Sequence, residues 1–266
     1  MQQIISWNVA SVRSRMSVLM KFLQESQPDI VLLQEIKATE ENFPFLDFKA
    51  LGYEAVISGQ KAYNGVAILS KLPLKDVVRE LPDAPQTDPM QARFIQATLP
   101  DETIIISVYV PNGTAPMNNP TDTSRLEYKL QWMQAFANHV ADLIKSGSEV
   151  LIGGDFNVIE RDSDVYNPDH FRGSALMVPP VREAFQKLNE LPLTNLIRQF
   201  NPAPNTYSFW DFQGGAWPRN CGILLDFFFA TKELASQVKL AKINKEVRAW
   251  EKTSDHAPIE CLVDKN

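Results

Sequence analysis

The chain is poor in several features that would place it in a special class of protein. It has two cysteines among 266 residues, Cys221 and Cys261, which lie far apart and lack the spacing of metal ligands. We therefore expect a reduced, cytoplasmic protein. The N-terminus has no charged segment followed by an apolar stretch, so we expect no signal peptide.

Long apolar runs and low-complexity tracts are also missing. The apolar run from Leu224 to Ala230 is interrupted by Asp226 and is far too short to span a bilayer, so we expect no membrane association. No Gly/Ser-rich or Pro-rich linker divides the chain. We therefore interpret residues 1–266 as one domain, for which a hydrophobic content of 44% is ordinary.

An excess of basic residues is absent as well, because 26 Lys and Arg face 32 Asp and Glu, for a net charge of −6. This argues against a protein that simply coats nucleic acid by neutralising its phosphates. It does not exclude a nuclease, since a metal site concentrates carboxylates that count as negative until the cation binds. The composition therefore gives only a slight argument against a function on nucleic acid.

What the sequence does contain is an alternation of buried-type strands and amphipathic helices in each half. Strand 4–8 precedes a helix with Met16, Leu19, Phe22 and Leu23 on one face, and strand 30–33 follows. In the second half, strand 104–110, a long helix capped by Ser124 and strand 150–152 repeat this order. Further strands are expected near residues 53–57, 65–69, 94–99 and 103–110. The pattern predicts an α/β protein with polar residues at strand ends, where such folds place their chemistry.

Two glycines follow the strand at 150–152, and Asp155 and Asn157 come after them. Because they stand two apart, an extended segment would place both side chains on one face. The carboxylate can take a proton from water or bind a cation, and the amide can hydrogen-bond a phosphoryl oxygen. A purely structural turn is the alternative interpretation.

A carboxylate and an imidazole are adjacent at Asp255 and His256, and the chain has only three histidines. Asp226 is a second acid of interest, because it interrupts the apolar run 223–229, where a carboxylate is costly unless it is paired. We predict that Asp226 pairs with an imidazole, orienting it and keeping it protonated. The alternative is an aspartate on an edge strand that faces water.

Glu35 follows the buried-type run 30–34 and is suited to hold Mg²⁺, with waters completing the coordination shell. A glutamate that starts a helix would have the same sequence context. Asn8 and Tyr109 also end predicted strands, but each is a weak indication by itself.

Together these segments closely resemble the exonuclease III family of DNA repair nucleases, within the endonuclease/exonuclease/phosphatase superfamily. The matching motifs occur in the family's order almost from end to end, which makes chance similarity very improbable. They are Ile-Ser-Trp-Asn-Val (5–9), Pro-Asp-Ile-Val-Leu-Leu-Gln-Glu-Ile-Lys (28–37), Tyr-Asn-Gly-Val-Ala-Ile (63–68), Val-Tyr-Val-Pro-Asn-Gly (108–113), Arg-Leu-Glu-Tyr-Lys (125–129), Gly-Asp-Phe-Asn-Val (154–158), Tyr-Ser-Phe-Trp-Asp (207–211) and Ser-Asp-His-Ala-Pro (254–258).

The resemblance implies a four-layer αββα sandwich, in which two mainly antiparallel sheets are flanked by helices. It also implies a phosphodiesterase of DNA base excision repair that uses Mg²⁺, for which Mn²⁺ can substitute. The implied partner is double-stranded DNA with nicks, gaps or blocked 3′ ends, and we expect the protein to be a monomer. The implied metal ligands are Glu35, with Asn8 and Asp255 near the same ion, and Asp155, Asn157 and His256 around a second ion if two bind.

The resemblance also assigns catalytic roles. Asp155 would position and deprotonate the attacking water. Asn157 and Tyr109 would bind the phosphoryl oxygens, while His256, paired with Asp226, would stabilise their developing charge. Asp255 completes the catalytic set. Candidate substrate contacts are Asn112, His170, Phe171, Arg172, Trp210 and Trp217, with Phe212 as a further candidate.

The chain departs from the family pattern at three places. Ala10 stands where a polar residue is usual, and Leu224 where arginine is common, so one hydrogen bond near the metal and one positive DNA contact are lost. In the third place, residues 167–171 read Asn-Pro-Asp-His-Phe, where members that cut at abasic sites commonly have Asn-Pro-Lys-Gly-Asn.

We hypothesise that the third departure selects the substrate. His170 and Phe171 would crowd the space that admits a flipped-out abasic sugar within a continuous strand. A frayed 3′ end needs less room, and its terminal base can stack on aromatic rings. The chain is therefore predicted to act as a 3′→5′ exonuclease and to clean 3′ ends, as a 3′-phosphatase or phosphodiesterase, with weak or no abasic-site incision. The alternative is a full abasic-site endonuclease in which His170 points into solvent.

Two other interpretations stay open on the sequence. A cousin in the superfamily could act on RNA, a phosphoinositide or a sphingolipid, although residues 125–128 and 208–211 favour the DNA branch. A nucleic-acid-binding regulator that keeps the fold without catalysis should have lost its metal and base positions, and here all of them are present.

Overall fold

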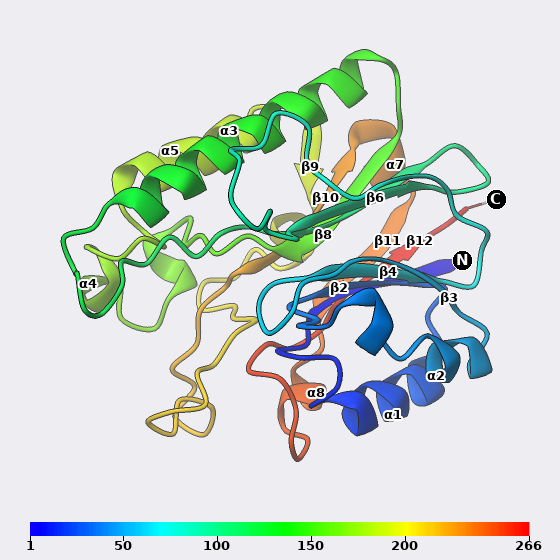
Figure 1. The fold of residues 1–266 in the computed structure, drawn as a ribbon, viewed down its shortest axis with the longest axis horizontal. Helices are drawn as coiled ribbons and strands as arrows, with labels where there is room; N and C mark the ends of the chain where they lie inside the picture. The colour runs from blue at the N-terminus through cyan, green and yellow to red at the C-terminus, as the bar shows by residue number, and fades with distance from the viewer. Residues whose placement is uncertain (266) are drawn as a thin grey trace.

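Two six-stranded sheets pack face to face in the computed structural model, which describes residues 1–265 (Figure 1). The first sheet has the spatial order β11 (Val238–Ile243), β12 (Ile259–Val263), β1 (Gln2–Asn8), β2 (Ile30–Gln34), β4 (Val66–Ser70), β3 (Glu54–Ser58). The second has the order β5 (Lys75–Val78), β6 (Phe94–Thr98), β7 (Ile104–Tyr109), β8 (Val150–Asp155), β10 (Asp226–Thr231), β9 (Leu193–Asn195).

Helices cover the outer faces of both sheets (Figure 1). Those outside the first sheet are α1 (Met16–Ser26), α2 (Phe45–Ala50) and α8 (Lys245–Arg248), and those outside the second are α3 (Ser124–Lys145) and α5 (Pro179–Asn189). The remaining short elements are α4 (Pro168–Phe171), α6 (Leu196–Phe200), α7 (Lys232–Ser236) and the 3₁₀ turns η1 (Glu40–Asn42) and η2 (Asp162–Asp164). The predicted four-layer αββα sandwich is confirmed.

Each sheet contains one parallel pair of strands, and the other pairs are antiparallel. The parallel pairs are β1 with β2, connected through α1, and β7 with β8, connected through α3. The strand–helix–strand order predicted for each half is therefore confirmed. Because parallel strands end at the same edge, Asn8 lies opposite Gln34, and Tyr109 lies opposite Asp155.

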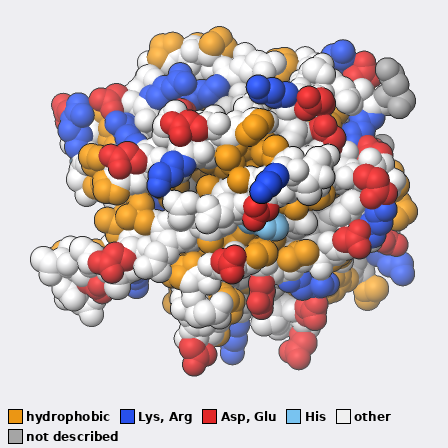
Figure 2. All heavy atoms as spheres, turned by 90° about the horizontal axis from the view of Figure 1, so that it is seen from above, with side chains coloured by type: hydrophobic (Ala, Val, Ile, Leu, Met, Phe, Trp, Pro, Cys, Tyr) orange, Lys and Arg blue, Asp and Glu red, His pale blue; other side chains and the backbone are white. Residues whose placement is uncertain are grey.

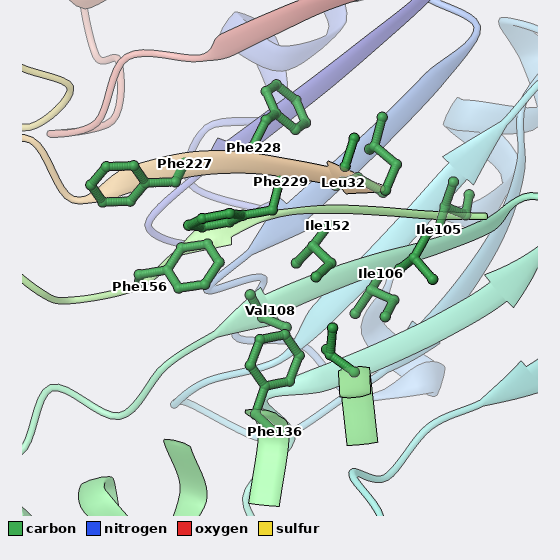
Figure 3. Packing of buried hydrophobic residues seen from close by; sticks show 14 of the residues in the cluster. Leu32, Ile105, Ile106, Val108, Phe136, Ile152, Phe156, Phe227, Phe228 and Phe229 are labelled. Atoms are coloured by element: carbon green, nitrogen blue, oxygen red, sulfur yellow. The ribbon is translucent and has the colours of Figure 1, made fainter. Parts of the chain in front are cut away.

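Apolar side chains fill the space between the sheets and the space under each helical layer. On β2, Ile30 and Leu32 belong to the core between the sheets, whereas Val31 and Leu33 pack toward α1. Both faces of the strand are buried, which explains its unbroken apolar sequence. Figure 3 shows the same division on β10, where Phe227 and Phe229 lie on the side of Phe156 and Phe228 points to the other side.

Two local predictions were wrong. Ser124 is the first residue of α3 rather than its cap; the cap position is Thr123, whose hydroxyl donates to Glu127 Oε1 at 2.6 Å instead of capping the backbone. Asp226 opens β10 rather than lying within it. Because β10 lies between β8 and β9 and Asp226 is 1% exposed, the alternative of an edge-strand aspartate facing water is excluded.

The helical face of the second sheet carries mixed charge. Figure 2 looks onto the side of the molecule that carries α3 and α5, and acidic and basic side chains alternate over it. Within residues 1–265, every helix falls short of the length and apolar character needed to cross a bilayer.

Candidate active site

Polar residues from five strands meet where the two sheets face each other. Asn8 ends β1 and Glu35 follows β2 in the first sheet, while Tyr109 and Asp155 end β7 and β8 in the second. Asp226 begins β10 and lies opposite Asp155 in the antiparallel ladder. The sandwich thus brings together residues that are more than 200 positions apart in the sequence.

Asn8 connects the two principal carboxylates. Its fully buried side-chain amide donates to Glu35 Oε1 at 3.0 Å and to Asp155 Oδ2 at 2.9 Å. Its own Oδ1 accepts from the backbone N–H of Ala10 at 3.1 Å. Ala10 therefore contributes its backbone to this network, although it lacks the polar side chain that the resemblance implied there.

Glu35 presents an ionised carboxylate to the site. Its backbone is in the left-handed region at φ +48°, so the chain leaves the extended path of β2 at this residue. Burial alone would raise the pKa of Glu35, but hydrogen bonds from Asn8 and Lys37 outweigh it and lower that pKa. The Lys37 ammonium lies 2.7 Å from Glu35 Oε2.

Two glycines allow β8 to carry Asp155 into the site. A Cβ atom on Gly154 would lie 2.1 Å from the Val108 carbonyl oxygen, and one on Gly153 would lie 2.6 Å from the Phe228 ring. Asp155 itself is 1% exposed. Burial raises the pKa of its carboxyl, against the opposing effect of the nearby His256, so Asp155 is a stronger base than an ordinary aspartate.

His256 pairs with Asp226, as predicted from the apolar run around that acid. His256 Nδ1 lies 2.8 Å from Asp226 Oδ2, and His256 Nε2 lies 3.6 Å from Asp155 Oδ2. Burial lowers the pKa of His256, but Asp226 and Asp155 outweigh it and raise that pKa to about 10, so the imidazole stays protonated. Ser208 Oγ also donates to Asp226 Oδ2 at 2.6 Å, and the Phe209 ring packs 4.9 Å from the imidazole.

Tyr109 stays a neutral phenol. Burial first, and then the charge of Glu35, raise its pKa well above the ordinary value, while Arg93 opposes them. The Arg93 guanidinium lies 4.8 Å from the centre of the Tyr109 ring and donates to the Tyr109 carbonyl at 3.3 Å. Tyr109 can therefore donate a hydrogen bond to an anionic oxygen.

Asn157 reaches Asp155 by a route other than the one expected. Its φ of +50° shows that the segment turns instead of staying extended, so the predicted extended segment was wrong. The turn is closed by the Asn157 backbone N–H, which donates to Asp155 Oδ1 at 2.9 Å. The Asn157 side chain donates to the Val110 carbonyl at 2.9 Å and accepts from Asn112 Nδ2 at 3.2 Å.

Asp255 lies at the edge of this network. Ser254 Oγ donates to the Asn8 carbonyl at 2.6 Å and lies 3.2 Å from Asp255 Oδ1, which links the Asp255 loop to the end of β1. The structure therefore brings all of the predicted catalytic and metal-binding residues into one region. They are Asn8, Glu35, Tyr109, Asp155, Asn157, Asp226, Asp255 and His256.

His170 and Phe171, two of the predicted substrate contacts, lie in the short helix α4, and Arg172 follows it. His170 is exposed, and its ring lies 5.0 Å from the half-buried Phe171, edge to face. Phe171 packs on a buried apolar cluster, against which Phe209 also packs. Arg172 forms ion pairs with Asp169 at 2.8 Å and Asp162 at 3.4 Å.

The two tryptophans expected to contact substrate differ in exposure. Trp210 is fully buried, and its indole N–H donates to Asn220 Oδ1, so the prediction that it contacts DNA was wrong. Trp217 is half-buried and packs edge-on against Trp210 at 4.8 Å. Phe212 is 54% exposed on the same loop. Leu224, where the resemblance implied an arginine, is fully buried.

Sequence reasoning assigned no role to five residues that shape the site. They are Lys37, Arg93, Lys129, Ser208 and Phe209. One signal was available for Lys129, because it falls on the apolar stripe of α3 with Trp132, Met133 and Phe136. A lysine on such a stripe is costly unless its charge has partners.

A divalent cation fits the donors of this site. Among the described residues no three His, Cys, Asp or Glu gather closely enough to hold a metal by themselves. Mg²⁺ usually keeps several waters and takes one or two carboxylates together with substrate phosphates. Glu35, ionised and anchored beside the Asn8 amide, is suited to such a site.

A surface cavity of about 670 Å³ opens beside these residues. Arg93, Asn112, Arg125 and Tyr128 line it, with the 71% exposed Tyr63 at its margin. The cavity thus offers two guanidinium groups next to the catalytic residues.

Comparison with known proteins shows what this arrangement resembles. Residues 5–256 match the model of the Endonuclease/Exonuclease/phosphatase family. The chain is 30% identical to exodeoxyribonuclease III of Haemophilus influenzae over 267 residues, which cover 97% of this chain and 98% of that protein.

Two solved structures resemble the fold over the whole of both chains. One is the 3′ phosphatase NExo from Neisseria bound to a product DNA hairpin, with 33% identity and a TM-score of 0.93. The other is an AP endonuclease from Archaeoglobus fulgidus, with 32% identity and a TM-score of 0.91. Overall likeness therefore does not separate 3′ phosphatases from abasic-site endonucleases.

Proposed function

The chain belongs to the Endonuclease/Exonuclease/phosphatase family, and from this premise we propose that it cleans and trims the 3′ ends of duplex DNA. It is a hydrolytic DNA repair nuclease of the exonuclease III and AP endonuclease group. The proposed activities are 3′-phosphatase or phosphodiesterase and 3′→5′ exonuclease at nicks, gaps or blocked ends. Incision at an internal abasic site is proposed to be weak.

The residues supply the steps of phosphoester hydrolysis. Asp155, whose pKa is raised by burial, takes the proton of the attacking water. His256, held protonated by Asp226, donates to a phosphoryl oxygen as negative charge develops on it. Tyr109 contributes a neutral phenol donor to the same group.

Glu35 and Asn8, with Asp255 near them, would hold a divalent cation, since the family is generally dependent on divalent metals. When bound, a metal of this kind neutralises phosphate charge and polarises the phosphoryl group. We propose Mg²⁺, with Mn²⁺ as a substitute. The cavity lined by Arg93 and Arg125 would receive phosphates of the strand next to the reacting group.

The single observation that supports a 3′ end as substrate is the position of Phe171. This ring and that of Phe209 pack against the same buried apolar cluster, and Phe209 lies 4.9 Å from the catalytic His256. α4 therefore rests on the same apolar support as the ring that packs on His256, which places its aromatic side chains on that side of the reacting centre. A flipped-out sugar inside a continuous strand would have to displace them, whereas a frayed terminal nucleotide can stack against them.

A panel of DNA ends tests this substrate. The panel contains a nicked duplex with a 3′-phosphate, a recessed 3′-hydroxyl end and a duplex with an internal abasic-site analogue. We expect the wild-type protein to act on the first two far faster than on the third. We expect His170→Gly to raise abasic incision relative to 3′-phosphate removal by about tenfold, about the size of one or two lost steric contacts.

Asp169→Asn is the matched control, because it changes the neighbouring residue of α4, keeps an oxygen that accepts from Arg172 and leaves both rings in place. This variant should keep the wild-type ratio of the two activities. Robust abasic incision by the wild-type protein that His170→Gly does not increase would overturn the substrate assignment in favour of a full abasic-site endonuclease.

A further inference from the structure

Lys129 is a fully buried lysine whose charge is directed at backbone atoms. Its ammonium donates to the carbonyls of Asn112 at 3.1 Å, Asn157 at 2.6 Å and Ala175 at 2.8 Å. An ammonium has three N–H donors, so these three bonds use all of them. The group is completely satisfied without a carboxylate among its acceptors.

Burying this charge is costly. Desolvation lowers the pKa of Lys129 to about 7, although the charge of Asp155 opposes the shift. The neighbouring positions on the same stripe of α3 are Trp132, Met133 and Phe136, so an apolar residue would serve packing equally well. The three bonds are what the ammonium adds.

The three carbonyls belong to segments that are separate in the sequence and adjacent at the site. Asn112 lies in the loop after β7, and its side chain donates to Asn157 Oδ1 at 3.2 Å. Asn157 lies in the turn after β8 that also holds Asp155. Ala175 lies in the segment that follows α4, four residues after Phe171.

Gly113 makes room for this arrangement. It has φ +82°, and a Cβ atom there would lie 2.8 Å from Lys129 Cδ and 3.3 Å from Ala175 Cβ. The loop after β7 therefore closes directly over the lysine side chain and lies against the segment that holds Ala175.

We propose that Lys129 is a positioning residue, which fixes Asn112 and Asn157 for phosphoryl binding and ties the α4 segment to the catalytic centre. It does not touch the reacting atoms; it acts through the backbone of residues that do. Removing its donors would leave three buried carbonyls without partners and free the three segments to shift. A shift of about 1 Å at such a site can cost about 10²-fold in rate.

Lys129→Met tests the inference, because methionine keeps the length and apolar stem and removes the donors. We expect kcat for 3′-phosphate release at a nick to fall about 10- to 100-fold, with little change in KM, because DNA contacts elsewhere are intact. Lys129→Arg, which keeps N–H donors, should recover most of kcat. Lys145→Met, an exposed lysine at the end of the same helix, should behave as wild type.

Hydrogen exchange of the protein alone provides a second measurement. In Lys129→Met, residues 111–114, 156–158 and 173–176 should exchange faster together, while residues 99–103 should not change. A uniform rise in exchange over the whole chain, with kcat falling only in proportion to the unfolded fraction, would reduce Lys129 to a packing residue. A Lys129→Met protein with wild-type kcat would overturn the proposal outright.

If Lys129→Met does not fold, Gly113→Ala replaces it, since the added Cβ displaces the lysine stem without removing the ammonium. We expect the same loss of kcat, and a folded Gly113→Ala with wild-type kcat would overturn the proposal. The inference rests on the proposed function for its kinetic measurement only. A wild-type protein that does not act on DNA 3′ ends would contradict that function, whereas the exchange pattern would still test Lys129.

Discussion

At the scale of single residues, the site depends on side chains that hold other side chains. One amide, that of Asn8, donates to both Glu35 and Asp155, and so it fixes the distance between the carboxylate suited to a cation and the carboxylate suited to a water. Asp226 likewise holds the His256 imidazole in place through a hydrogen bond and keeps it protonated. The chemistry therefore depends on these buried partners as much as on the reacting groups.

Asp226→Asn should separate the role of the carboxylate from its shape. The amide cannot keep His256 protonated and need not keep its orientation, so we expect kcat for 3′-phosphate release to fall about 10²- to 10⁴-fold with little change in KM. Steady-state kinetics at neutral pH measure this. Asp211→Asn, an exposed aspartate on the loop after Trp210, should change kcat little. A loss of less than threefold in Asp226→Asn would contradict the assigned role.

The same substitution should change how stability depends on pH. His256 has a folded-state pKa raised to about 10, so its charged form contributes stability that is complete below its unfolded pKa of about 6.5. That contribution is lost as the pH rises from there through the folded value. In Asp226→Asn the loss between pH 7 and pH 10 should shrink, because only the other acids near His256 still raise its pKa; urea unfolding of the two proteins measures the difference.

The pH dependence of activity should follow Asp155. Burial raises the pKa of this base to about 7, so activity should fall as the pH is lowered through neutrality and the carboxylate takes up a proton. A bound cation favours the ionised form, so this acidic limb should move to lower pH at saturating Mg²⁺. Profiles of kcat/KM at limiting and saturating Mg²⁺ measure the shift. A profile flat between pH 5 and pH 8 would rule out Asp155 as the base.

Some of these residues were predictable and others were not. Asp226 was predictable because a carboxylate in an apolar run needs a partner, and the predicted imidazole is its partner. Ser208 and Phe209 were not singled out, because a serine and a phenylalanine are common everywhere. Their roles depend on a bridge between Phe209 and both Ile223 and His256, which no local pattern reveals.

At the scale of elements, the glycines of β8 are the most constrained feature. Gly154→Ala would place a methyl group 2.1 Å from the Val108 carbonyl oxygen, a backbone atom that cannot rotate away. We expect unfolding to become easier by about 3 kcal/mol or more, which exceeds the usual cost of overpacking because the backbone of β7 must shift. Urea unfolding measures this change.

Gly173→Ala is the control, since a Cβ atom there meets nothing within 4 Å and its backbone needs no positive φ. It should change stability by less than about 0.5 kcal/mol. A Gly154→Ala protein as stable as Gly173→Ala would show that β7 and β8 do not approach as closely as described.

The long elements were predictable and the short ones were not. β2, β7 and β8 are buried on both faces, so their continuous apolar sequences identified them, and α1 and α3 showed helical spacing. α4 has four residues and β9 has three, too few for any periodicity. β11 repeats buried, exposed and half-buried positions and has a register shift between Val238 and Leu240, so it lacks the period of two that identifies a strand.

At the scale of the whole molecule, the site exists only because two sheets meet. Gln34 donates to Ser6 at 3.2 Å within the first sheet and to Ser107 at 3.0 Å in the second, and Ser107 donates back to the Leu33 carbonyl at 3.1 Å. This buried polar link lies directly before Glu35. It fixes the active-site residues that the first sheet carries in place against those that the second sheet carries.

The sequence could place residues at strand ends, but it could not show which ends face each other. Periodicity predicted an α/β protein but not how its sheets and helices are layered. The four-layer sandwich was predicted from the resemblance to a family. Trp210 illustrates the limit, because its position after a motif suggested a DNA contact and the packing of the 211–221 loop buries it.

The most direct test of the central claim is phosphate release from a 3′-phosphate at a nick, measured for the wild-type protein and Glu35→Gln with Mg²⁺ and with EDTA. Glu41→Gln, an exposed glutamate of η1, is the control and should match wild type. We predict that the chelator and Glu35→Gln each reduce release by at least about 10²-fold, the usual cost of removing one electrostatic stabiliser. Release that persists in EDTA, or undiminished in Glu35→Gln, would contradict metal-assisted hydrolysis at this site.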